Sequence, residues 1–193
     1  ENNIFEVDGS FLIDDDDYPI DLNVKSQNFN IKPFSAIGEN VLQNFEGYFN
    51  SKLKVSGTFF EPSFDGYIQA LDSSFDVPYL GVRYAFPSNP SFNLSGMSIY
   101  IDNFRLQDVL KKTEGILTGK INHKRLKDWF LDFNIKSNNL LVIDTTIEEN
   151  NTYYGLGMFN GSAIFYGPGK NLDINISGST NKNTKITIPI KYD

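Results

Sequence analysis

The sequence of 193 residues contains no cysteine, which excludes disulfides, thiolate metal sites and a cysteine nucleophile. It contains one histidine, His123, so a site built from several histidines is excluded as well. Basic residues are few, because 17 Lys and Arg stand against 24 Asp and Glu, giving a formal net charge of -7. This balance argues against nucleic acid as a partner. No run approaches the roughly 18 apolar residues of a membrane-spanning helix.

Apolar and aromatic residues, by contrast, are plentiful. Hydrophobic residues make up 40% of the chain, with 17 Phe and 10 Tyr, which is too apolar for a disordered protein. The length fits about one domain with a core of its own. The sequence begins with Glu1 and no basic, apolar leader precedes it, so we expect a fragment, residues 1–193, of a longer protein.

Alternation of apolar and polar residues runs along much of the chain and is typical of half-buried β-strands. The pattern apolar-Asp-apolar-Asn-apolar occurs at 20–24, 131–135 and 172–176, with a looser copy at 64–68. By subtraction, the aspartates of these copies lie 44, 67 and 41 residues apart, and we interpret the longest spacing as one that holds an insertion: Asp21, Asp65, Asp132 and Asp173.

The repeated pattern predicts an all-β fold. Its approximate units are 20–60, 64–121, 131–163 and 172–190, and a hairpin of this size buries its apolar face only by stacking on its neighbours. We therefore expect an elongated, curled antiparallel or mixed sheet with an apolar trough. Helical spacing also predicts one or two short helices, over residues 34–45 and 105–112.

Candidate chemical sites are weak. The acidic run Asp14–Asp17 could hold a calcium ion, but it lacks the EF-hand spacing and is more typical of a solvated turn. His123 lies among polar residues and is interpreted as a surface residue. The repeated aspartates are interpreted as solvating the polar face of their strands. No catalytic residue, metal site or cofactor is predicted, and we expect a protein without enzymatic activity.

Strands lying side by side would align their apolar residues into one band. A closed sandwich or barrel would bury this band, whereas an open trough would offer it to a greasy ligand. The pattern alone leaves both open. The candidate groove residues are Leu22, Val24, Phe49, Leu53, Val55, Ile68, Ile99, Ile101, Phe133, Ile135, Ile174, Ile176, Ile186 and Ile188.

Two stretches resemble a known family. The run from Leu53 to Phe86 reads, from residue 54 onward, KVSGTFFEPSFDGYIQALDSSFDVPYLGVRYAF. It resembles a repeat of the TamB proteins, the inner-membrane subunits of the translocation and assembly module in the AsmA-like group. The words NLLVIDTT at 139–146, YYG at 153–155 and TIPI at 187–190 are similar to the carboxy-terminal region of Bacteroidota members, and the likeness spans about residues 20 to 190.

The resemblance implies a β-taco, a long curled sheet with an apolar trough, in a periplasm-spanning parent protein anchored in the inner membrane. It further implies a role in phospholipid transport to the outer membrane and in outer-membrane protein assembly and secretion, with phospholipid acyl chains and an outer-membrane barrel as partners. The alternative function is that of a closed β-sandwich, serving as an adhesin or glycan-binding module.

Overall fold

The computed structural model describes residues 3–12, 19–33, 42–125, 128–169 and 171–190. Strands account for most of them, and one short 3-10 helix, η2 (Pro78–Leu80), interrupts the series. The strands are β1 (Ile4–Phe11), β2 (Pro19–Asn30), β3 (Gln43–Thr58), β4 (Pro62–Val77), β5 (Val82–Ala85), β6 (Ser91–Ser95), β7 (Ser98–Asp108), β8 (Glu114–Lys124), β9 (Asp128–Thr145), β10 (Tyr154–Pro168), β11 (Asp173–Thr180) and β12 (Lys185–Thr187).

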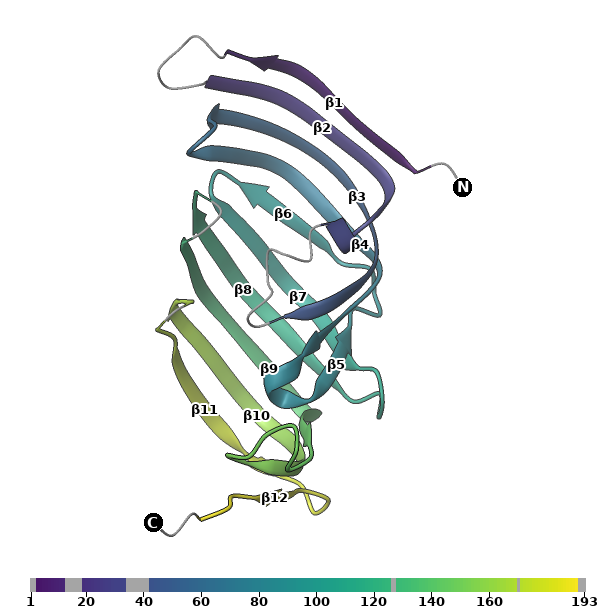
Figure 1. The fold of residues 1–193 in the computed structure, drawn as a ribbon, viewed down its shortest axis with the longest axis vertical. Helices are drawn as coiled ribbons and strands as arrows, with labels where there is room; N and C mark the ends of the chain where they lie inside the picture. The colour runs from purple at the N-terminus through teal and green to yellow at the C-terminus, as the bar shows by residue number, and fades with distance from the viewer. Residues whose placement is uncertain (1–2, 13–18, 34–41, 126–127, 170, 191–193) are drawn as a thin grey trace.

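All twelve strands belong to one antiparallel sheet. Its order follows the chain, β1-β2-β3-β4-β5-β7-β8-β9-β10-β11, while β6 pairs with β4 and β7 and β12 pairs with β10. Figure 1 shows the strands stacked along the longest axis of the molecule, with β1 at one end and β11 and β12 at the other. The expected elongated, all-β fold is confirmed.

Two positions in the sheet are shared by a pair of short strands. β5 and β6 both pair with β4 and with β7, and residues 86–90 leave the sheet between them. At the far edge, β11 pairs with the second half of β10 and β12 with residues 154–156. In each case two short strands, one after the other, pair with different parts of the same long strand, which is β4 in the first case and β10 in the second.

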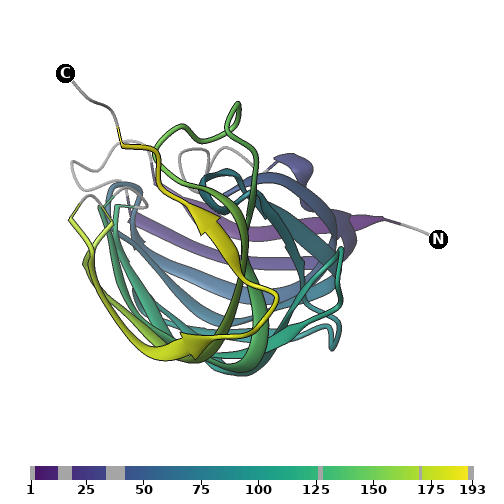
Figure 2. The same cartoon turned by 90° about the horizontal axis from the view of Figure 1, so that it is seen from below.

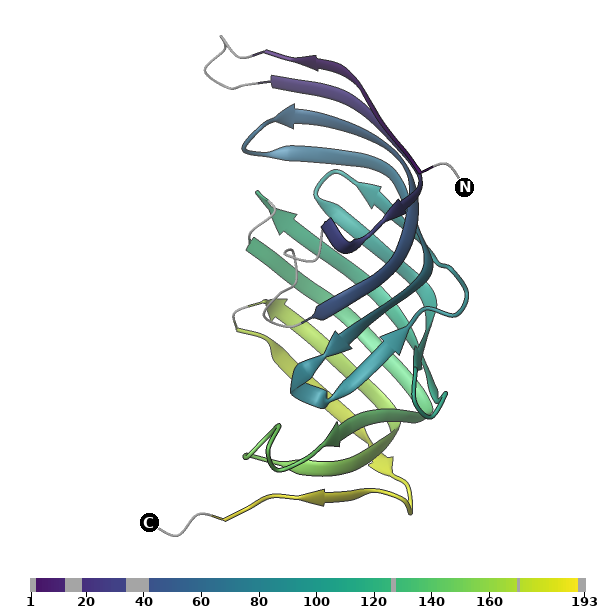
Figure 3. The same cartoon turned by 45° about the vertical axis from the view of Figure 1, so that its right-hand side comes forward.

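The sheet is strongly curved. Seen along the long axis, the strands form a U whose mouth lies between two rims (Figure 2). The first rim consists of the ends of β1, β3, β6, β8 and β10 with the beginnings of β2, β4, β7, β9 and β11, and the second of the opposite ends of these strands. Near the second rim, the ends of β4, β5, β9 and β10 fold over the U and form a front wall (Figure 3).

The repeated aspartates fall on alternate strands. Asp21 lies on β2, Asp65 on β4, Asp132 on β9 and Asp173 on β11. The two shorter spacings each advance two ladder positions, whereas the 67 residues from Asp65 to Asp132 advance four. The longest spacing therefore contains one further pair of strands, β7 and β8, each of only 11 residues.

The expected helix over 105–112 is wrong. Residues up to Asp108 complete β7, and a turn follows before β8 begins at Glu114. The spacing that suggested a helix arises because Leu106 points into the core from a strand while Val109 and Leu110 lie in the turn after it. In the expected helix over 34–45, residues 34–41 lie outside the described residues, and Gln43 to Phe45 open β3.

Candidate functional site

The candidate site is the apolar face of the sheet, called the inner face below. Residues opposite one another in antiparallel strands project to the same side. Register therefore places one unbroken row across the sheet from β1 to β10: Val7, Val24, Leu53, Gly66, Leu94, Ile99, Ile121, Leu131 and Gly167.

The structure places twelve of the fourteen candidate groove residues on this inner face. Parallel rows on either side of the one above contain the others, for example Ile101, Gly119, Phe133, Phe165 and Ile174 in succession. Ile186 belongs to β12, opposite Gly155, and Ile188 follows the end of that strand. The twelve are Leu22, Val24, Phe49, Leu53, Val55, Ile68, Ile99, Ile101, Phe133, Ile135, Ile174 and Ile176.

Burial along the inner face varies from the middle to the ends. In the middle, Phe49, Val55 and Ile101 are buried by other side chains of the same face. On the terminal strands the face is open: Phe5 and Val7 of β1 are exposed, and Ile176 of β11 is 67% exposed. The apolar surface that a ligand could contact without displacing protein atoms therefore lies at the two ends of the sheet.

A packed core fills the U near the second rim. It joins Val82 and Tyr84 of β5 and Leu106 of β7 with Leu140 and Leu141 of β9. Leu140, which is 1% exposed, lies over Gly115, where an added Cβ would be 3.2 Å from its Cδ2 atom. The absence of a side chain at position 115 therefore makes room for Leu140.

The front wall contains a seam between β5 and β9. The Tyr84 hydroxyl donates a hydrogen bond of 2.7 Å to the Leu141 carbonyl, and the Leu141 amide donates one of 2.8 Å to Thr113 Oγ1. The Tyr153 hydroxyl also donates to the Tyr79 carbonyl, at 2.9 Å. Burial, with Tyr79 nearby, raises the pKa of Tyr153 to about 12. Of these three bonds, the one from Tyr84 joins β5 to β9 directly. The other two attach the β7–β8 turn to β9, and η2 to the residue before β10.

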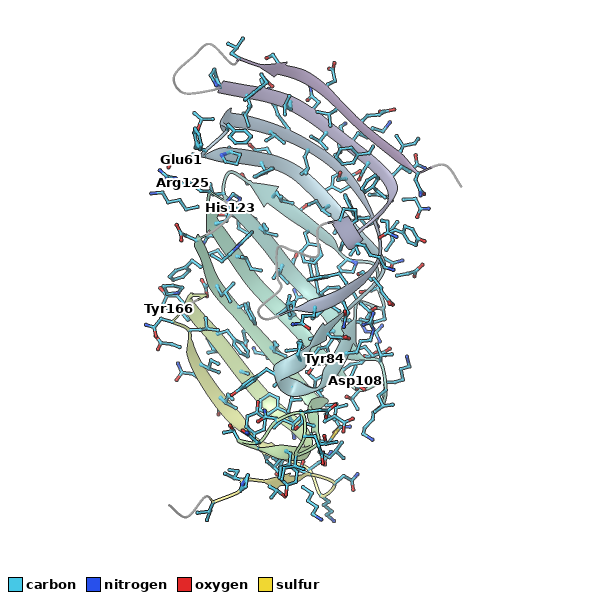
Figure 4. The ribbon with its side chains drawn as sticks, in the orientation of Figure 1. Glu61, Tyr84, Asp108, His123, Arg125 and Tyr166 are labelled. Carbon is cyan, nitrogen blue, oxygen red and sulfur yellow. The ribbon has the colours of Figure 1, made fainter. Side chains whose placement is uncertain are left out.

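Asp108 is the charged group at the centre of this region, beside Tyr84 in Figure 4. It is fully buried, and its carboxylate accepts hydrogen bonds from the amides of Lys111 at 2.5 Å and Thr113 at 2.7 Å and from the Thr113 hydroxyl. Burial and the proximity of this carboxylate raise the pKa of Tyr84. These bonds fold the β7–β8 turn and hold Thr113 where it meets Leu141, which is a structural role.

His123 was expected on the surface, and that expectation is wrong. It is 5% exposed and lies on the inner face at the first rim, with the rings of Phe64 and Trp129 each 5.6 Å away. Its Nδ1 atom has no hydrogen-bond partner among the described residues. The polar neighbours misled the interpretation, whereas alternation from Ile121, two residues earlier, indicates the inner face.

The surroundings of His123 lead to a prediction about pH. Burial lowers the pKa of His123 in the folded chain. As pH falls, His123 is therefore protonated first in the unfolded chain, where its pKa is about 6.5. The stabilisation from the neutral ring is complete above that value and is lost as pH falls through the lower, folded pKa. Urea unfolding at pH 7.5 and pH 5.5 should therefore show a larger loss of stability for the natural chain than for His123→Phe. Equal losses in the two proteins would contradict this account.

The remaining candidates carry no site. The acidic run at 14–17 lies outside the described residues. The four repeated aspartates lie on the outer face, where Asp21 pairs with Lys54 at 3.4 Å and Asp65 accepts a hydrogen bond from Ser95. The described part of the chain has no cluster of His, Asp and Glu that could hold a metal. It likewise has no helix of the length and apolarity needed to cross a membrane.

Two surface features were not anticipated from the sequence. Tyr67, Tyr100 and Tyr166 share one row on the outer face, linked in register through Asn93, Lys120 and Asp132. Phe59 and Phe60 occupy the centre of the β3–β4 turn and are 63% and 57% exposed. Turns are usually polar, so two adjacent Phe between turn-flanking Gly57 and Pro62 was the signal available for the second feature.

Comparison with known families gives a match over the second half of the chain. Residues 102–192, just under half of its length, match the family model described as the TamB C-terminal domain. The matched segment begins inside β7 and covers β8 to β12, including Leu140 and the exposed end of the inner face on β11. The searches of curated proteins and of solved structures gave no match.

Proposed function

We propose that this chain, whose residues 102–192 match the TamB C-terminal domain model, is a non-enzymatic lipid-conduit segment of a periplasm-spanning, TamB-like protein. In this role it contacts phospholipid acyl chains on their way to the outer membrane. The parent protein takes part in outer-membrane protein assembly together with a barrel partner. The curled sheet then corresponds to the β-taco that the family resemblance implies.

The observation that carries the proposal is the continuity of the inner face. Apolar residues succeed one another across the sheet without a charged residue in the row from Val7 to Gly167. The face is still exposed on β1 and β11. Each acyl methylene that leaves water for such a surface contributes about 0.8 kcal/mol, and no fixed charge holds the head group. A surface of this kind favours weak, repeated contacts over tight binding.

The packed core in the middle of the U would have to open for lipid to pass along the whole sheet. Acyl chains can lie against the terminal strands as they stand, but the core around Leu140 and Leu141 occupies the space between. Passage along the whole inner face therefore requires the seam between β5 and β9 to open. β5 and β9 are not neighbours in the sheet and are joined by the hydrogen bond from Tyr84 to Leu141, so the wall would open at this seam.

Replacing Ile176 by aspartate should reduce the phospholipid bound to the purified protein by about tenfold in affinity, because a charge would stand on the exposed inner face. Native mass spectrometry of the protein purified from membranes measures the bound lipid. The matched control is Asn175→Asp, which adds the same charge one residue away on the outer face.

The two variants separate the possible outcomes. Loss of lipid in Ile176→Asp with retention in Asn175→Asp supports contact along the inner face. Equal lipid content in both variants, or a natural chain that carries no lipid, contradicts the conduit.

The second candidate, a glycan-binding module, is favoured only by the outer-face row of Tyr67, Tyr100 and Tyr166. The closed sandwich that this candidate assumes is not formed by the described residues, which make one sheet. An oligosaccharide bound by a lipid-free protein and lost in Tyr100→Ala would reverse the order of the two candidates.

A further inference from the structure

The first rim carries a cluster of exposed apolar side chains at or after the ends of β1, β3 and β6. They come from the end of β1 and the residue after it, from the β3–β4 turn and from the β6–β7 turn. We call this cluster the aromatic rim: Phe11, Leu12, Phe59, Phe60 and Met97, each more than 40% exposed.

The three phenylalanines of the aromatic rim lie next to one another. The ring centroids of Phe11 and Phe59 are 6.0 Å apart, and those of Phe59 and Phe60 are 5.6 Å apart. The Phe64 amide donates a hydrogen bond of 2.8 Å to the Gly96 carbonyl, which joins the β3–β4 hairpin to the turn bearing Met97. The three rings are therefore in contact at the mouth of the U, and the turn that carries Met97 is held beside them.

The turn that carries the two central rings does not depend on them. Thr58 and Glu61 exchange backbone hydrogen bonds across it, at 3.2 and 3.4 Å, and the Thr58 hydroxyl accepts a further bond from the Glu61 amide. Phe59 and Phe60 lie on this closed turn with more than half of each side chain exposed. The hydrogen bonds that close this turn therefore involve neither Phe side chain. Exposed apolar side chains gathered in this way indicate a binding surface.

Charges beside the aromatic rim indicate which surface it fits. Arg125 pairs with Glu61 at 3.5 Å, and Lys124 stands opposite Asp128 in the register of β8 and β9. Figure 4 shows Glu61, Arg125 and His123 together at this rim. The described charges balance locally, while the whole chain has a net charge of -7. A protein of this net charge repels an anionic surface and a nucleic acid. The aromatic rim therefore fits a partner whose surface is amphipathic and has no net charge.

We propose that the aromatic rim docks on a zwitterionic lipid surface, with its Phe, Leu and Met side chains entering the interface between head groups and acyl chains. Aromatic and aliphatic side chains on projecting turns gain free energy by leaving water at such an interface. The mouth of the U then faces the lipid, so that an acyl chain can pass between the bilayer and the inner face. Docking itself does not require lipid to move along the sheet.

Flotation with phosphatidylcholine vesicles tests the proposal. The natural chain should float with the vesicles. The double variant Phe59→Ser, Phe60→Ser should bind the vesicles at least about tenfold more weakly. The matched control, Leu110→Ser with Ile147→Ser, removes two exposed apolar residues from turns at the second rim and should bind normally. Emission from Trp129, the single tryptophan, verifies that each variant is folded.

The proposal is overturned if the natural chain stays in solution, if both double variants lose binding equally, or if binding needs phosphatidylglycerol and disappears in high salt. Loss confined to the Phe variant, at any salt concentration, supports it. Bound lipid in the mass spectrum is a separate result. A chain that carries lipid but does not float refutes docking and leaves the conduit intact, and floating without carried lipid does the reverse.

Discussion

Replacing Gly119 by alanine is expected to lower the free energy of unfolding by about 2–4 kcal/mol, as measured by urea denaturation. Gly119 has φ +146°, a conformation that residues with a Cβ rarely adopt. A Cβ at this position would lie 2.2 Å from the Asp132 carbonyl oxygen, on a neighbouring strand that cannot move alone. The ladder between β8 and β9 would have to open at the centre of the sheet.

A second glycine provides the control. Gly96 also has a positive φ, +62°, but an added Cβ would meet no atom within 4 Å. Gly96→Ala should therefore cost only the backbone penalty, about 1 kcal/mol. The same close approach to a carbonyl on the next strand recurs at Gly9, Gly66 and Gly161. If both alanine variants cost the same, the approach of the strands at Gly119 is not what requires glycine.

Replacing Leu140 by alanine is expected to lower the free energy of unfolding by about 2–5 kcal/mol, because it leaves a cavity in the packed core. Leu140 lies over Gly115, which has no side chain to fill the space that alanine would leave. Thermal or urea unfolding followed by circular dichroism measures the loss.

The control is Leu110→Ala, in the β7–β8 turn, where the side chain is 71% exposed and its removal should change stability by less than about 0.5 kcal/mol. A small effect at Leu140, equal to that at Leu110, would mean that the β5–β9 seam is not packed in solution.

Alternation was sufficient to predict the strands and the inner face. Leu22 and Val24 were assigned to one side because residues two apart in a strand share a face, and register places them in rows with Val55 and Leu53. The alternation does not indicate whether other side chains or solvent lie against the inner face. It could not show that Ile101 is buried in the middle while Ile176 is exposed at an edge, because this depends on the curvature of the whole sheet.

Two predictions from the sequence were wrong for local reasons, and one feature, the core at Leu140, could not be predicted at all. Around Leu106 the apolar residues follow a spacing of three and four, which a strand that ends in a turn can imitate. Around His123 the composition of the turn outweighed the alternation of the strand before it. The core at Leu140 joins residues more than 50 positions apart, as the bond from Tyr84 to Leu141 shows, and no periodicity reports such a contact.

The shared ladder position of β5 and β6 limits how the length of this chain can change. Both strands run in the same direction, so the five residues 86–90 between them can vary in number without reversing any later strand. Insertion or deletion of a single strand between the β3–β4 and β6–β7 turns would exchange the two rims for every turn that follows. Phe59 and Met97 would then end on opposite sides of the mouth. Evolution can therefore lengthen or shorten such a sheet only by pairs of strands if the aromatic rim is to stay on one side.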